Sequence, residues 1–222
     1  YGLTEAGTVL TVNDLRPFRP DTVGPPVDGV ELQIRDADAT GAGEVWARGP
    51  TVMRGYFRSD ALTRDTIVDG WLRTGDVGWI DPAGHLHLVG RRRNMIVTAG
   101  GKNVYPEDVE AAFDGVDGVE ELCVFAADYV WPRAERSLTG ETLLVAVRLR
   151  DGAALNDVAA ALAARNRRLA DYKRVASVVA TTEPFPRTAS MKVKRDPLAA
   201  FLRANTKRED AIPLAPAAPC TT

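Results

Sequence analysis

Hydroxyl, carboxylate and basic side chains gather in four short segments of this sequence, each with small residues that leave a ligand room to approach. The segments are YGLTE (residues 1–5), RTGD (73–76), GRRRNMIVTAGGKNVYPEDVE (90–110) and PRTASMKVKR (186–195). A threonine hydroxyl can donate to a phosphate, a carboxylate can hold Mg²⁺ beside it, and an aspartate can accept hydrogen bonds from the two hydroxyls of a ribose. Arginine donates to phosphate or ribose oxygens. The four segments together are therefore consistent with a nucleotide site.

Each segment alone also has an ordinary structural interpretation. TGD is commonly a turn at the end of a strand, GG is usually a loop, and three successive arginines are usually solvated surface. The segment that ends in MKVKR fits a phosphate-binding loop, a nucleic-acid patch or a localisation signal. The order and spacing of the four segments favour the nucleotide interpretation.

Composition limits the classes of protein to which these segments can belong. The chain has 222 residues, of which 45% are hydrophobic and 26% charged, and its formal net charge is −2. This balance gives no support for a general nucleic-acid or membrane binder, and no apolar run approaches the roughly 20 residues that span a bilayer. The two cysteines, Cys123 and Cys220, lie far apart and indicate a reducing compartment. We therefore expect a cytoplasmic protein that is not transmembrane and binds no nucleic acid.

Up to about residue 90, the apolar residues alternate with polar ones as they do in half-buried strands. This period predicts strands at 29–36, 43–49 and 84–90. In the last of these, His85 and His87 alternate with leucines, so we expect both histidines on the open face of the strand.

From about residue 95, the pattern changes to strands mixed with helices. Proline and two acids at 106–108 suit the first turn of a helix that runs to residue 113. Further elements are expected in this part: strands at 120–130 and 142–150, an alanine-rich helix with an apolar face from Leu155 to Leu169, and a last helix that starts at Asp196 and Pro197. After about residue 205 the sequence is charged, then rich in proline and alanine, and shows no periodicity.

In this order, the segments resemble the AMP-forming adenylating superfamily, which comprises acyl- and aryl-CoA synthetases, luciferases and the adenylation domains of nonribosomal peptide synthetases. The family patterns are YGxTE, a GE…GY segment, WxxTGD, GRxxxxIxxxG and PxTxxGKxxR. Their counterparts here are YGLTE, GEVWARGPTVMRGY, WLRTGD, GRRRNMIVTAGG and PRTASMKVKR. The resemblance covers roughly residues 1 to 203, and GGKNVYPEDVE looks most like the fatty acyl-CoA synthetase branch.

The resemblance implies a combined α/β and α+β fold. Residues 1–92 would form the last part of a large adenylating body, mainly its β-barrel subdomain. Residues 93–204 would form a small, mobile α+β lid, and residues 205–222 a Pro/Ala-rich tail.

The resemblance also implies roles for residues of the body. Thr4 would contact the α-phosphate of ATP, Glu5 would help to hold Mg²⁺, and Tyr1 would lie beside the adenine. Asp76 would bind the ribose hydroxyls, and Arg91 would bind ribose or phosphate oxygens.

In the lid, the implied roles concern lid rotation, CoA and the adenylation step. Arg93 falls at the hinge position, and Gly100 and Gly101 would line the path of the CoA pantetheine. Lys192 matches the catalytic lysine that bridges the carboxylate and the phosphate during adenylation, with Lys194 and Arg195 in a supporting or surface role. The sequence departs from the pattern at Met191, where the family usually has glycine, and at Arg187, where it has lysine.

The function implied is that of an AMP-forming acid–thiol ligase. Such an enzyme uses ATP and Mg²⁺ to convert a carboxylic acid, here a fatty acid, to acyl-AMP and then transfers the acyl group to CoA. Two alternatives stay open: an adenylating enzyme that loads an acyl carrier protein, and a non-catalytic binding module of the lid type. The sequence begins inside YGLTE without a methionine and contains no Ser/Thr/Gly-rich phosphate loop that ends in lysine. We therefore expect a fragment of a longer enzyme that is inactive alone.

Overall fold

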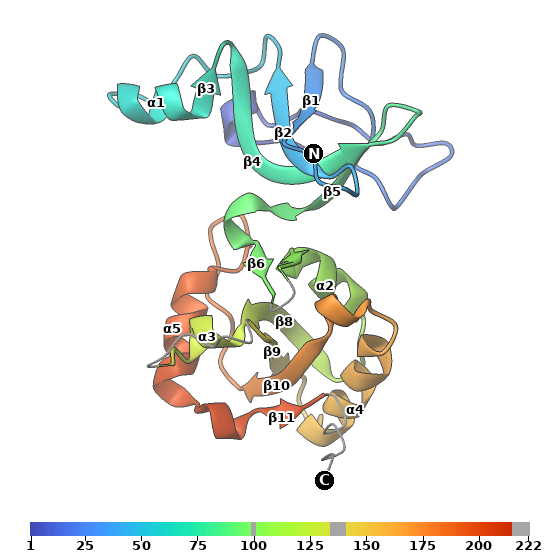
Figure 1. The fold of residues 1–222 in the computed structure, drawn as a ribbon, viewed down its shortest axis with the longest axis vertical. Helices are drawn as coiled ribbons and strands as arrows, with labels where there is room; N and C mark the ends of the chain where they lie inside the picture. Colours follow the sequence, from blue (N-terminus) through green and yellow to red (C-terminus); the bar gives the residue numbers. More distant parts are fainter. Residues whose placement is uncertain (99–100, 134–140, 215–222) are drawn as a thin grey trace. The chain divides into compact units, whose positions relative to one another are not determined.

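The structure is a computed structural model that describes residues 1–98, 101–133 and 141–214. The chain divides into two compact units, Tyr1–Asn94 and Met95–Thr222 (Figure 1). No helix in the described residues is long and apolar enough to cross a membrane.

The first unit is a curled, five-stranded antiparallel sheet. Its elements are η1 (Thr4–Ala6), β1 (Glu31–Arg35), β2 (Gly43–Arg48), α1 (Asp60–Thr66), β3 (Ile67–Val68), β4 (Trp71–Ile80), β5 (Leu86–Arg91) and η2 (Arg92–Asn94). The strand order is β1-β2-β4-β3, and β5 pairs with the far half of β4. Figure 1 shows β4 bending so that it belongs to both parts of the sheet. The strands predicted at 29–36, 43–49 and 84–90 are confirmed to within a few residues.

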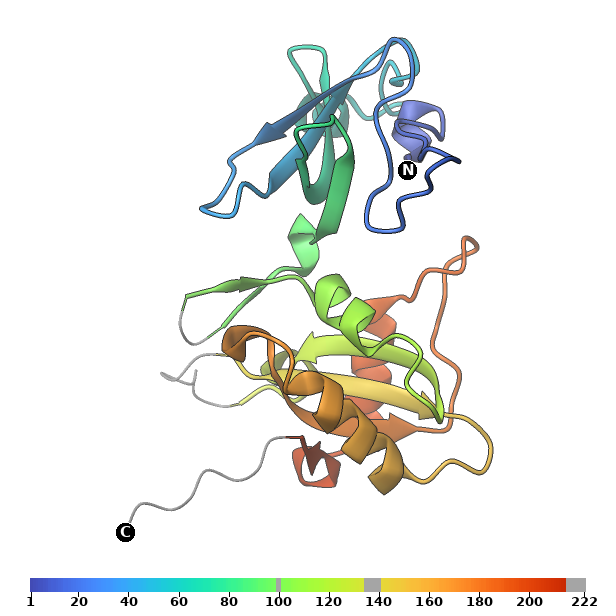
Figure 2. The same cartoon turned by 90° about the vertical axis from the view of Figure 1, so that its right-hand side faces the viewer.

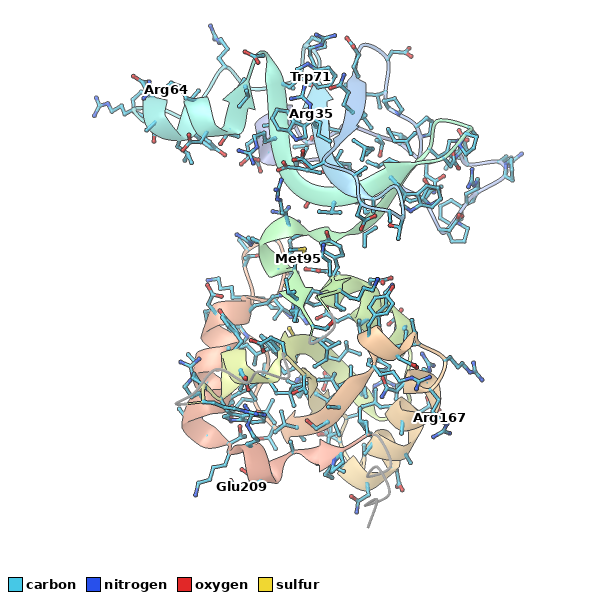
Figure 3. All side chains as sticks on the ribbon, in the orientation of Figure 1. Arg35, Arg64, Trp71, Met95, Arg167 and Glu209 are labelled. Carbon is cyan, nitrogen blue, oxygen red and sulfur yellow. The ribbon has the colours of Figure 1, made fainter. Side chains whose placement is uncertain are left out.

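Apolar and aromatic residues occupy opposite faces of this sheet. One face packs Leu72 and Ala47 against the N-terminal segment that carries η1. On the other face the Arg35 guanidinium lies 3.9 Å from the ring centroid of Trp46 and 5.5 Å from that of Trp71 (Figure 3). Each such cation–π contact contributes about 0.5–1 kcal/mol at an exposed site. Arg48 also lies over Trp71 and Arg73 over Trp46, so arginine side chains cover two tryptophans that would otherwise face water.

The prediction that His85 and His87 lie on an open face is wrong. Both side chains are buried, because the segment before β1 folds over them. Asp21 accepts a hydrogen bond from His87 Nδ1 through its backbone carbonyl (2.8 Å), and Arg19 Nη1 donates to His85 Nδ1 (3.0 Å). The strand alternates as predicted, but the covering segment is more than 60 residues away in sequence.

The second unit is an α/β sandwich with three layers. Its elements are β6 (Ile96–Val97), β7 (Asn103–Val104), α2 (Pro106–Phe113), β8 (Val119–Ala126), α3 (Ala127–Val130), β9 (Leu143–Leu149), α4 (Leu155–Asn166), η3 (Asp171–Lys173), β10 (Val175–Thr181), α5 (Arg195–Asn205), η4 (Arg208–Asp210) and β11 (Ile212–Pro213). The main sheet has the order β11-β10-β9-β8, in which only the β9–β10 pair is parallel, and β6 and β7 form a separate hairpin. This mixed architecture confirms the predicted fold class.

Helices cover both faces of the main sheet (Figure 1). Val109 of α2 and Leu162 of α4 pack on one face, and Leu198 and Leu202 of α5 pack on the other. The central strand β9 is buried on both faces, which explains why its sequence reads as a continuous apolar run rather than as an alternating one.

Three local predictions about this unit need correction. The predicted strand 120–130 ends at Ala126, and residues 127–130 form the helix α3, which packs against α5. Helix α4 ends at Asn166, so Leu169 reaches the core from the turn beyond it. Part of the expected tail is also built into the fold. Residues 212–213 pair with β10, and Leu214 is buried, because apolar side chains interrupt the charged sequence there.

Candidate functional site

The Thr-Gly-Asp sequence forms a bulge inside β4 rather than the strand-ending turn that the motif alone suggested. In the pairing of β4 with β2, residues 74–76 lie opposite Val45 alone, between the pairs Arg73–Trp46 and Val77–Glu44. Gly75 has φ +70°, a left-handed conformation that glycine adopts without steric cost. The Thr74 hydroxyl donates to the Val45 carbonyl (2.6 Å) and accepts from the Asp76 N–H (3.1 Å). The bulge therefore fixes the direction of the Asp76 side chain.

Asp76 is held by two donors, one at the N-terminal end of the sequence and one on the neighbouring strand β5. The Tyr1 hydroxyl donates to Oδ2 (2.6 Å), and Arg91 Nε lies 2.8 Å from Oδ1. Burial, and then the neighbouring Asp76 carboxylate, raise the pKa of the Tyr1 hydroxyl well above its usual range, so Tyr1 stays a donor. Each carboxylate oxygen has a second lone pair, which leaves acceptor capacity for a ligand hydroxyl. The structure thus brings together three of the residues predicted from the sequence.

Thr4 and Glu5 lie in η1, at the start of the same unit. Thr4 is exposed, and Glu5 is half-buried and accepts a hydrogen bond from the Tyr56 hydroxyl at Oε1 (2.8 Å). The described residues contain no cluster of three or more potential metal ligands. One carboxylate with a free oxygen nevertheless fits Mg²⁺, which in nucleotide sites takes most of its ligands from phosphate and water.

Tyr56 belongs to the MRGY segment, which helped to define the family resemblance but had no role assigned to it. Its backbone N–H donates to the hydroxyl of Thr63 in α1 (2.9 Å), while its side chain orients Glu5. The GY at the end of the family's GE…GY pattern could have pointed to this tyrosine, but its partner lies 51 residues away.

The three successive arginines have different environments. Arg91 is bound to Asp76, and Arg92 Nη1 lies 2.8 Å from the buried Glu44 carboxylate. Arg93 is exposed in the short helix η2, two residues before the second unit begins. Two of the three thus bind buried carboxylates of the first unit, although the Arg92 side chain is still 49% exposed.

Of the glycine pair, Gly100 lies outside the described residues. Gly101 is exposed in the turn between β6 and β7 and has φ +67°. A Cβ at this position would meet nothing within 4 Å. The positive φ therefore explains why position 101 favours glycine. The passage of the pantetheine along this segment stays a prediction.

Lys192 lies on a hairpin-like loop that projects from the second unit between β10 and α5 (Figure 2). An isolated bridge joins Arg187 to Val193, and the Thr188 N–H donates to the Lys192 carbonyl (2.8 Å). The ammonium groups of Lys192 and Lys194 have no ion-pair or hydrogen-bond partner among the described residues. Lys192 is therefore an exposed cation that pairs with no other described residue.

Arg195, by contrast, is an anchor of α5. Its guanidinium donates to Glu110 (2.7 Å) and to the Val124 carbonyl (2.6 Å), and its side chain is 17% exposed. It thus joins the start of α5 to α2 and β8. Of the supporting and surface roles expected for Arg195, these contacts fit the supporting one.

Met191 occupies the turn immediately before Lys192, with φ +64°. This is the left-handed conformation that glycine, the usual family residue, adopts freely. Methionine therefore keeps the backbone path of the glycine turn at a conformational cost of about 1–2 kcal/mol.

We expect Met191→Gly to keep or raise the melting temperature, because glycine adopts this backbone conformation without steric cost and the lost side chain is 67% exposed. Met191→Val should lower the melting temperature, since a β-branched residue is strongly disfavoured at positive φ. Thermal unfolding of both variants and of the unmodified protein measures these effects. A lower melting temperature in the glycine variant would show that the methionine side chain itself contributes to stability.

Comparison with known proteins identifies relatives of both units. The family model for AMP-binding enzymes matches residues 1–57. The chain is 37% identical over 202 residues to the 3-[(3aS,4S,7aS)-7a-methyl-1,5-dioxo-octahydro-1H-inden-4-yl]propanoyl:CoA ligase of Mycobacterium tuberculosis, covering 89% of this chain and 37% of that protein. It is 41% identical over 110 residues to a long-chain-fatty-acid–CoA ligase of Mycobacterium bovis, covering 50% of this chain and 18% of that one.

A solved structure with the same fold is the O-succinylbenzoate coenzyme A synthetase of Bacillus subtilis in complex with AMP. The TM-score is 0.74 at 27% identity, and the match covers 89% of this chain and 40% of that one. The chain thus spans well under half the length of these relatives. Its ordered motifs and both sets of matches lead to one assignment: the chain belongs to the AMP-forming adenylating superfamily.

Proposed function

We propose that this chain is the C-terminal part of an AMP-forming acid–CoA ligase. The observation that carries the proposal is the Asp76 carboxylate, which the β4 bulge, Tyr1 and Arg91 hold in a fixed direction with acceptor capacity left for a ribose. The relatives support it, since the two proteins matched by sequence are CoA ligases and the matched structure contains AMP.

In the proposed first half-reaction, an oxygen of the acid attacks the α-phosphorus of ATP, forming acyl-AMP and releasing pyrophosphate. Asp76 orients the nucleotide through its ribose hydroxyls, and Thr4 donates to the α-phosphate. Lys192 places a full positive charge beside the carboxylate and the phosphate as negative charge moves between them. Mg²⁺, held with the help of Glu5, would neutralise charge on the phosphates.

In the second half-reaction, the CoA thiolate attacks the acyl carbonyl and AMP leaves. We assign the path of the pantetheine to the Gly100–Gly101 segment, and we assign the reorientation of the second unit between the two half-reactions to a hinge at Arg93. A mobile lid requires such a change at a few backbone positions.

For the acid, we propose a fatty acid, on the likeness of GGKNVYPEDVE to the fatty acyl-CoA synthetase branch and on the match to a long-chain-fatty-acid–CoA ligase. The other two relatives are named for a ring-bearing propanoate and for succinylbenzoate, so the acid panel must include aromatic and polycyclic acids. Free CoA compared with a phosphopantetheinylated carrier protein identifies the acceptor. Absence of AMP release with every acid would favour a non-catalytic binding module.

In the enzyme that carries this sequence, Asp76→Ala should weaken ATP and AMP binding by about 10–100-fold, since hydrogen bonds to a charged group contribute about 1.5–3 kcal/mol and about 1.4 kcal/mol corresponds to tenfold. Isothermal titration with AMP measures the effect directly. Tyr1→Phe is the matched control, because it removes one donor to Asp76 and keeps the carboxylate. A drop in melting temperature without a change in nucleotide affinity would mean that Asp76 is structural.

A further inference from the structure

Arg187 links the peptide bond that precedes Lys192 to a buried carboxylate on the main sheet. Its Nη1 donates to the Met191 carbonyl (2.6 Å), and its Nε donates to Glu121 Oε1 (3.0 Å), which a second guanidinium nitrogen also contacts. One planar guanidinium thus joins β8 to the Met191–Lys192 peptide. Since the fork of donors is rigid, the two contacts fix the position of the loop relative to the sheet.

Glu121 is a buried carboxylate that is held by other donors as well as by Arg187. Its side chain is 8% exposed, and its other oxygen accepts the Phe185 N–H (3.0 Å) and Arg148 Nε (2.6 Å). Burial alone would raise the pKa of Glu121, but the hydrogen bonds from Phe185, Arg187 and Arg148 together hold it below its ordinary value. The carboxylate therefore stays charged at neutral pH, and it anchors the loop at its first residues as well as near its tip.

These contacts give the basic residues of the loop different environments. The two arginines at its ends are committed to carboxylates, Arg187 to Glu121 and Arg195 to Glu110, while Lys192 is exposed between them. If its backbone is held in place, a lysine keeps only the freedom of its four side-chain torsions. Fixing the backbone reduces the conformational entropy that is lost when the ammonium is placed beside the reacting groups.

We propose that Arg187, held by Glu121, is a positioning residue that sets the backbone of Lys192 for the adenylation step. This inference rests on the proposed function of Lys192 and adds that the backbone of its loop must be held in place. Arg187 does not touch the substrates; it acts through the Met191–Lys192 peptide.

The test uses the enzyme that carries this sequence and the variant Arg187→Met, which keeps an extended apolar stem and removes the donors. We expect acyl-adenylate formation to fall about 10–100-fold in kcat, since a displacement of about 1 Å at a catalytic group can cost about 10²-fold. KM for ATP and thioester formation from supplied acyl-adenylate should change little. Arg187→Lys, which restores a cation beside Glu121, should recover part of the adenylation rate.

Arg203→Met is the matched control. Arg203 also donates to backbone carbonyls, those of Val130 (2.9 Å) and Tyr129 (2.7 Å), but it lies on α5 and has no contact with the Lys192 loop in the described residues. Its loss should leave both half-reactions within about twofold of the unmodified enzyme, because surface substitutions away from a site usually have small effects. Hydrogen exchange gives a readout besides activity: amides in 187–194 should exchange faster in Arg187→Met and not in Arg203→Met.

The outcomes separate this inference from the proposed function. Equal loss of both half-reactions in Arg187→Met, or an unchanged adenylation rate while Lys192→Ala is impaired, would overturn the positioning role alone. An unimpaired Lys192→Ala enzyme would overturn the proposed function as well. If Arg187→Met does not fold, Glu121→Gln takes its place, because the amide keeps the size and one acceptor oxygen; it should show the same selective loss in smaller measure.

Discussion

Replacing Lys192 by alanine should lower the rate of acyl-adenylate formation by at least about 10²–10³-fold, the loss that follows removal of one donor that stabilises transition-state charge. A full cation in a water-excluded site contributes more than a neutral donor, because its field is less screened there. The structure makes this expectation specific, since the Lys192 ammonium is exposed and has no partner in the described part of the chain. Its removal therefore breaks no contact that stabilises the described fold.

Both half-reactions should be measured on the same Lys192→Ala preparation. Pyrophosphate exchange reports adenylation, and thioester formation from supplied acyl-adenylate reports the second step, which we expect to be largely retained. Lys194→Ala is the matched control, because Lys194 is also exposed and also lacks a partner among the described residues. Comparable losses in both half-reactions would mean that Lys192 acts on the structure rather than on the phosphate.

Replacing Arg93 by proline should abolish thioester formation and leave pyrophosphate exchange mostly intact. Arg93 lies in η2, whose 3₁₀ conformation has φ of about −50° to −70°. Proline fixes φ near −65°, so Arg93→Pro is compatible with the backbone conformation at this position. If the proposed hinge must move to another φ for thioester formation, proline blocks that change.

Arg93→Ala is the control for this prediction, because the role proposed for Arg93 is one of the backbone and its side chain is exposed. Both half-reactions of the alanine variant should be close to those of the unmodified enzyme. Since proline also disfavours the helical conformation of the preceding Arg92, thermal unfolding of Arg93→Pro checks that the fold is kept. Normal CoA ligation by the proline variant would place the hinge elsewhere.

Local sequence patterns determined much of the architecture. Alternation of apolar residues predicted β1, β2 and β5, and the proline and acids at 106–108 predicted α2 with its observed bounds. The ordered motifs placed the chain in its superfamily and led to the prediction that Asp76 and Lys192 take part in the reaction. The confirmed strands and helix share a physical basis: strand period, helix capping and turn preference act between residues that are close in sequence.

The tertiary structure decided what each functional group touches. Tyr1 and Asp76 are 75 residues apart, and Arg187 and Glu121 are 66 apart. No sequence pattern singled out Glu121. His85 and His87 were predicted to lie on an open face, although the segment around Arg19 and Asp21 covers them. Such pairings depend on which segments pack together, and packing depends on the burial and charge of the whole chain. A motif can therefore name the residue that carries the chemistry, whereas the partners that fix its position are set by contacts between segments that the local pattern does not encode.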